Sequence, residues 1–224
     1  METLIISLLP YIIASAVFPL QIILGLLLLK SPEQGLLKAI AFVSGKIITR
    51  LAQGLIFSWI LVGVETTKED SKNLVASTLL LVLGILLLIA AYKKWQHVED
   101  PDEPPSKWLT MLDRATPLKA LGLGLVLPLI AAKLWVFTLS ALTTIAAAQL
   151  GQPTSTIAYL LFILLTETPL LLAILLRILL PKQSQATLLQ ASNWLNHYNR
   201  PISITVALIF GLWFLSSGIK GLMA

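Results

Sequence analysis

The stretch Gly35–Val64, GLLKAIAFVSGKIITRLAQGLIFSWILVGV, is apolar and long enough to cross a bilayer as one helix, yet it carries two cations near its middle. Lys46, Arg50 and Gln53 are spaced at i, i+4 and i+7, so a helix places all three on one face. A cation at the bilayer centre costs about 3 to more than 10 kcal/mol, so this polar stripe must face protein, water or a ligand. The stripe therefore predicts an interior, in which these residues bind substrate. The alternative is that the two cations snorkel or pair with an acid only for folding.

Composition assigns the chain to the integral membrane proteins. Hydrophobic residues make up 57% of the 224 residues and charged residues 12%, and the mean hydropathy is +0.87. An ordinary soluble domain is less apolar and about twice as charged. The apolar runs have the length of membrane helices, whereas barrel strands would alternate over about 10 residues.

The predicted fold is an all-α integral membrane protein with six transmembrane helices. We expect the spans at about Leu4–Leu29, Gly35–Val64, Leu74–Tyr92, Leu118–Leu150, Ile157–Leu180 and Ile202–Leu222. The start METLIISLLP lacks the basic region of a signal peptide, so the first span is expected to be retained.

Prolines predict helix breaks at Pro19, Pro128 and Pro169, because each removes a helix hydrogen bond and frees a carbonyl. Gln21 lies beside the first of these breaks and is a further candidate for substrate binding. A kink that serves only helix packing is the other interpretation.

Two hydrophilic segments have the pattern of helices that lie on the membrane surface. In SKWLTMLDRA, residues 106–115, Trp108 and two leucines share a face opposite Lys107, Asp113 and Arg114. A plain loop helix without a partner explains the same pattern. The segment SQATLLQASNWLNHYNR, which ends at Arg200, is the second candidate.

The distribution of Lys and Arg predicts that both termini lie outside. Most of these residues follow the first, third and fifth spans, and basic loops stay cytoplasmic. With three spans per half, the second half enters the membrane from the opposite side, as in an inverted repeat. We therefore expect a first repeat at 1–92, a cytoplasmic linker with its interfacial helix at 93–117, and a second repeat at 118–224. Similar sequence around Pro19 and Pro128 agrees with this arrangement.

The spans also predict a group of charges at mid-depth. Arg50, Lys133 and Glu167 fall at similar depth, and Lys46 lies about 6 Å nearer the cytoplasm. Three cations meet one acid, so a cavity that receives a sulfate, phosphate or carboxylate is expected, with Lys133 among the binding residues. Burial that leaves Lys46 or Lys133 uncharged would remove this surplus.

Glu167 is the lone acid within a span and is the candidate coupling residue. Together with the carbonyl freed by Pro169, its carboxylate could hold a proton or a cation. The alternative is a permanent salt bridge from Glu167 to Arg50 or Lys133.

Three classes of function compete on these features: a transporter with a polar midplane cavity, a membrane enzyme, and a scaffold with complete ion pairs. The spans hold no catalytic constellation, so no enzyme activity and no catalytic residue are expected. Cysteine is absent, and the two histidines, His97 and His197, are expected in loops, so we expect no metal and no cofactor. The net charge of +5 follows the positive-inside rule and predicts no nucleic-acid partner. Membrane lipids are the expected partners, and a homodimer is left open.

Several segments resemble the sulfolipid-addressing (Sap, also called GAP) family of the lysine-exporter (LysE) superfamily. They are FPLQIILGLLLLKSPEQGLLKAIAFVSGK, PPSKWLTMLDRATPLKALGLG, AAKLWVFTLSA, TETPLLLAILL and NRPISITVALIFGLWFLSSGIKGL. The resemblance implies a bacterial inner-membrane protein with six helices in inverted repeats, linked to the export of glycolipids and related envelope lipids. The expected function is transport of an anionic lipid, glycolipid or small anionic solute by alternating access. The alternatives are a non-transporting scaffold for envelope lipid assembly and an exporter of amino acids or small ions.

Overall fold

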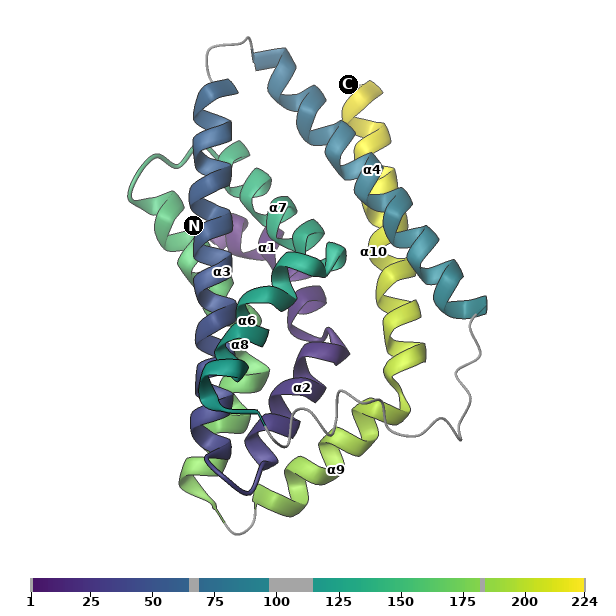
Figure 1. Ribbon diagram of the computed structural model, residues 1–224. Coiled ribbons are helices and arrows are strands. Elements are labelled where there is room, and N and C mark those ends of the chain that lie inside the picture. The colour runs from purple at the N-terminus through teal and green to yellow at the C-terminus, as the bar shows by residue number, and fades with distance from the viewer. Residues whose placement is uncertain (1, 65–68, 97–114, 182–183, 224) are drawn as a thin grey trace.

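The described part of the chain is helical in the computed structural model, which covers residues 2–64, 69–96, 115–181 and 184–223 (Figure 1). The linker helix expected around residues 106–115 lies almost wholly outside these ranges. The helices are α1 (Glu2–Ala16), α2 (Pro19–Lys30), α3 (Gly35–Val64), α4 (Glu69–Gln96), α6 (Pro117–Ile130), α7 (Ala132–Ala147), α8 (Thr154–Leu179), α9 (Ser184–His197) and α10 (Asn199–Met223).

Several of these helices can cross a membrane, and the chain is a multi-pass membrane protein. Within the described residues, the single helices that qualify by length and hydropathy are Gly35–Phe57, Thr154–Leu179 and Asn199–Met223. Two bent pairs, α1 with α2 and α6 with α7, also qualify if each pair is one span, which gives three to five candidate spans. The third expected span falls within α4. The expected total of six remains a prediction.

The helix breaks match the prolines only in part. Pro19 is the first residue of α2, and the α1–α2 pair bends by 57° just before it, as predicted. The 70° bend of the second pair lies at Ala131, not at Pro128, which is buried inside α6. The predicted break at Pro169 is wrong, because α8 is continuous through it. Neighbouring helices and threonine side chains can satisfy the backbone around a membrane proline, and Thr166 and Thr168 both donate to α8 carbonyls.

Two pairs of helices meet at backbone distance through glycines. On α3 and α6, a Cβ added to Gly124 would collide with the Phe42 carbonyl, and one added to Gly45 would collide with the Leu121 carbonyl. Small residues allow such close approach where the surrounding lipid provides no hydrophobic drive for helix association. Thr49 adds a hydrogen bond of 2.8 Å to the Leu125 carbonyl. The α3–α6 contact therefore fixes the height of the cation stripe.

The antiparallel α4 and α10 form the second such pair (Figure 1). A Cβ on Gly218 would lie 2.7 Å from the Leu81 nitrogen, and one on Gly84 would lie 2.7 Å from the Leu215 nitrogen. At the other end of the pair, the Arg200 guanidinium donates to the carbonyls of Lys94 and Trp95, at 3.3 and 2.7 Å. The two helices are thus joined at both ends.

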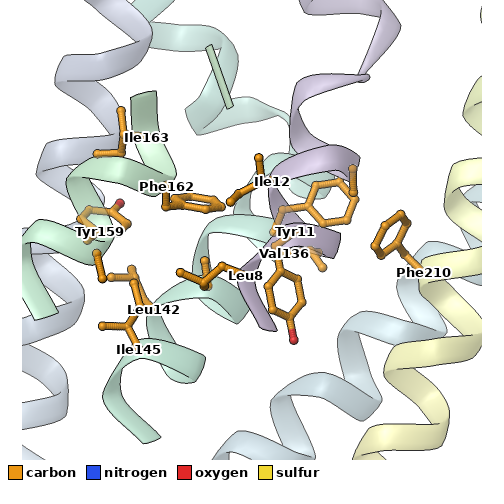
Figure 2. Packing of buried hydrophobic residues seen from close by; sticks show 14 of the residues in the cluster. Leu8, Tyr11, Ile12, Val136, Leu142, Ile145, Tyr159, Phe162, Ile163 and Phe210 are labelled. Carbon is orange, nitrogen blue, oxygen red and sulfur yellow. The ribbon is translucent and has the colours of Figure 1, made fainter. Parts of the chain in front are cut away.

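A hydrophobic core connects α1, α7, α8 and α10 (Figure 2). Tyr11 of α1 stacks on Trp213 of α10 with ring centroids 5.6 Å apart, and Phe137 of α7 meets Phe210 edge to face at 5.5 Å. On the opposite side of the core, Phe162 of α8 stacks on Tyr159. This core places α8, and with it Glu167, against the cation stripe of α3.

The glycine contact predicts opposite effects for two neighbouring positions of α6. Gly124→Ala should force α3 and α6 apart and destabilise the protein by about 1 to 3 kcal/mol, the cost of an overpacked contact. Gly122→Ala is the matched control, because a Cβ there meets nothing within 4 Å and alanine favours helix. Thermal unfolding in detergent should show a lower Tm for Gly124→Ala alone. Equal Tm values for both variants would contradict the close approach.

Candidate functional site

The polar stripe of α3 faces the protein interior, as predicted. Lys46 is 1% exposed, Arg50 is fully buried and Gln53 is 2% exposed, although all three lie on a candidate membrane span. Ionisable groups in such a position are costly and mark functional sites unless they are fully paired. Their partners therefore decide what this site can do.

Glu167 of α8 is shared by both cations of the stripe. Its Oε2 lies 2.6 Å from the Lys46 Nζ, and its Oε1 lies 3.6 Å from the Arg50 Nε. The carboxylate is fully buried. If all three groups are ionised, two positive charges face one negative charge, and the cluster of Lys46, Arg50 and Glu167 carries a net charge of +1. This charge cluster is electrostatically incomplete within the described residues.

Contacts from two other helices, α1 and α8, position the Arg50 side chain and backbone. Its Nη2 donates to the Ser15 Oγ at 2.6 Å, and the Tyr159 hydroxyl donates to the Arg50 carbonyl at 2.6 Å. The guanidinium carbon lies 5.7 Å from the centroid of the Phe162 ring, where the ring face attracts a cation. Ser15 precedes the α1–α2 break, and Gln21 donates from its Nε2 to the Ser15 carbonyl. The break therefore brings the start of α2 to the charge cluster.

Several buried polar atoms of this site have no hydrogen-bond partner among the residues that the structure describes. They are the Arg50 Nε and Nη1, the Glu167 Oε1 and the Gln21 Oε1. Buried polar atoms are almost always paired, because an unmade hydrogen bond costs about 1 to 3 kcal/mol. These atoms offer both donors and an acceptor to a ligand or a proton.

Among the other predicted residues whose side chains the structure describes, Gln53 lies outside the charge cluster. Gln53 donates from its Nε2 to the Pro128 carbonyl at 3.4 Å, so it connects α3 to α6 near the Ala131 break. Lys133 lies at the start of α7, and its side chain is outside what the structure describes. His197 was predicted to lie in a loop, and this is wrong, because it is the last residue of α9. His97 is outside the described residues.

The polar cavity predicted at mid-depth is not open in this structure. The three charged side chains are at most 1% exposed, and Phe42 and Phe162 each lie 5.7 Å from one of the cations. The charge cluster is closed to solvent.

Sequence reasoning missed Tyr159 and Phe162 and the central part played by Lys46. Tyr159 precedes Glu167 by two helical turns on α8, so the 3.6-residue period places both on one face. That spacing could have identified it. The alternative considered for Glu167 was a salt bridge to Arg50 or Lys133. Among the described side chains its shortest contact is with Lys46, and Arg50 is the more distant partner.

Comparison with known protein families accounts for most of the chain. Residues 8–220 match the family model described as Sap, sulfolipid-1-addressing protein. The chain belongs to this Sap family. The match includes every residue of the charge cluster and both bent helix pairs from Leu8 onward. No curated protein and no solved structure matches the chain.

A double-mutant cycle tests the short ion pair between Lys46 and Glu167. Lys46→Met or Glu167→Gln alone should destabilise the protein by about 3 to 5 kcal/mol, because breaking a buried pair leaves charge without compensation. The double variant should lose clearly less than the sum of the two. Chemical unfolding in detergent measures all three, with exposed Lys220→Met as the control for loss of a lysine. Additive losses would show that the two side chains do not interact.

Proposed function

We propose that this Sap-family protein transports an anionic lipid or a related anion across the membrane by alternating access. The observation that carries the proposal is the charge cluster, in which two buried cations share one carboxylate inside candidate membrane spans. A scaffold would be expected to have complete ion pairs. An excess cation with unused donors instead supports the binding of an anionic group, and transport rather than catalysis.

The family supports a lipid as the transported molecule. Its description names a sulfolipid, and a role in lipid addressing or export follows from membership. A sulfate is an anion whose oxygens accept from a guanidinium in the same way as a phosphate. The proposed substrate class is therefore a lipid with an anionic headgroup.

The proposed architecture is two inverted repeats of three spans, 1–92 and 118–224, joined by the linker 93–117. Each half begins with a bent helix pair, 57° in the first and 70° in the second. The next helix of each half, α3 or α8, supplies charges of opposite sign to the cluster. The last helices also correspond, since α4 contacts α7 and α10 contacts α2. We propose that both termini lie outside a bacterial inner membrane, because most Lys and Arg residues follow the first, third and fifth expected spans.

Glu167 is the proposed coupling residue. Its Oε2 binds Lys46, whereas its Oε1 has no hydrogen-bond partner among the described atoms and can take a proton without displacing that lysine. Protonation would leave Lys46 and Arg50 without a counter-charge and so favour an anionic headgroup. Deprotonation would restore the pairing and expel the headgroup. Among the described residues, Ser15 of α1 and Tyr159 of α8 also hydrogen-bond to Arg50 at this site.

Removal of one buried cation should abolish transport. Arg50→Gln should reduce the movement of fluorescent phosphatidylglycerol between the leaflets of proteoliposomes to the level of protein-free vesicles, because the headgroup loses its fork of donors. Lys220→Gln removes a cation from an exposed position of α10 and should leave transport unchanged. Leaflet exchange is measured by dithionite quenching. Normal exchange by Arg50→Gln protein that elutes as a single folded species would show that the charge cluster is structural.

Neutralising the acid should separate exchange from accumulation. Glu167→Gln resembles the protonated carboxyl, so leaflet exchange of fluorescent phosphatidylglycerol should persist while its accumulation under a pH gradient disappears. Should this variant unfold, the double variant with Lys46→Gln removes one charge of each sign and is tested instead. Full accumulation under the gradient by either folded variant would exclude Glu167 as the coupling residue.

A further inference from the structure

An apolar groove lies between α2, α8 and α9, beside the charge cluster. Its volume is about 530 Å³, within the range of ligand sites. Its lining is hydrophobic except for Thr187 and includes Ile22, Leu26, Pro169 and Ala173. The exposed Ala191 of α9 belongs to the same lining.

The groove has the length of one leaflet. Its lining on α8 extends from Pro169 to Leu179, and these residues span about 15 Å along the helix axis, half of the roughly 30 Å hydrocarbon thickness. The groove is formed by a candidate span and one half of a bent pair, so it lies in the hydrocarbon region. Its natural occupant there is a hydrocarbon chain.

The two ends of the groove differ in charge. The end of the groove nearer the middle of the membrane is lined by Ile22 and Pro169. Ile22 directly follows Gln21, and Pro169 lies two residues after Glu167, so this end reaches the depth of the charge cluster. At the end of the groove nearer the membrane surface, Lys30 follows the lining residue Leu26 by four positions. Arg177 follows the lining residue Ala173 by the same spacing. Four residues are about one helical turn, so both cations lie on the helix faces that line the groove. Lys30 is exposed. A cationic outer end matches an anionic headgroup at the membrane surface.

We propose that this groove binds one acyl chain of the anionic lipid before its headgroup enters the charge cluster. The headgroup lies at Lys30 and Arg177, and the chain extends along α8 to Pro169. This loading role rests on the proposed transport of an anionic lipid, whereas the lipid site itself does not depend on it. The α9 helix closes the groove on one side, where its buried Leu188 is packed.

Photo-crosslinking in vesicles tests the site directly. The full chain is reconstituted in phosphatidylcholine vesicles that contain phosphatidylglycerol with a diazirine at the end of one acyl chain, and the labelled peptides are mapped by mass spectrometry. Because the end of the chain is expected near Pro169, labelling should concentrate on residues 169–173 and 22–26, with several-fold less label on the exposed faces of α3 and α10. The same diazirine on phosphatidylcholine should label these residues several-fold less.

Two variants with matched chemistry distinguish the groove from other lipid contacts. Ala191→Trp fills the groove from an exposed position and should reduce its labelling several-fold, whereas Ala52→Trp places the same ring on an exposed face of α3 and should not. Lys30→Gln should remove the preference for phosphatidylglycerol. Even labelling of all lipid-facing helices, unaltered by Ala191→Trp, would mean ordinary boundary lipid and overturn the site. Absence of label from the groove, together with a dimer in native mass spectrometry that Ala191→Trp disrupts, would overturn it in favour of a dimer interface.

The transport assay and the labelling experiment can reject the two proposals separately. Loss of transport in Arg50→Gln together with even labelling would retain the proposed function and reject the groove. Normal transport in Arg50→Gln together with labelling blocked by Ala191→Trp would retain the lipid site and reject its loading role.

Discussion

Two buried cations share one buried carboxylate, and the relative position of α3 and α8 depends on this shared ion pairing. Glu167 offsets part of the cost of burying Lys46 and Arg50, and the two cations in turn offset part of the cost of burying the carboxylate. The two cations come from α3 and the acid comes from α8, so these two helices must keep a fixed distance. The glycine contact of α3 with α6 and the aromatic core around α8 both serve that requirement.

The charge cluster and the apolar groove together complement the two parts of an amphipathic anion. The charge cluster is buried and cationic, and the groove is apolar and open along α8. Glu167 of α8 belongs to the charge cluster, and Pro169 of the same helix lines the groove. An anionic lipid has the same two parts in the same order. Discrimination between such lipids would come from the donors, because a hydrocarbon groove accepts chains of many kinds.

Much of the fold and part of the site were predictable from sequence, because the bilayer imposes length and polarity on every span. The buried stripe of Lys46, Arg50 and Gln53 followed from helical spacing and the cost of intramembrane charge. Its partners did not, since depth alone cannot tell which neighbouring turn a long lysine side chain reaches. The break near Pro128 was placed three residues early for a similar reason. A proline removes one hydrogen bond, but α6 continues past Pro128 and the bend lies at Ala131.

The joining of α4 to α10 has a mechanical consequence. One helix belongs to the first half of the chain and the other to the second, yet their backbones touch at Gly84 and Gly218, and Arg200 fastens the far end. A rocking motion that separated the first half of the chain from the second would have to break the whole contact between α4 and α10. A motion that costs less free energy keeps α4 and α10 together as one rigid unit that rotates relative to the other helices. The stacked rings of Tyr11 and Trp213 are the contact about which this unit would rotate. The moving unit of this protein would then contain one helix from each half of the chain.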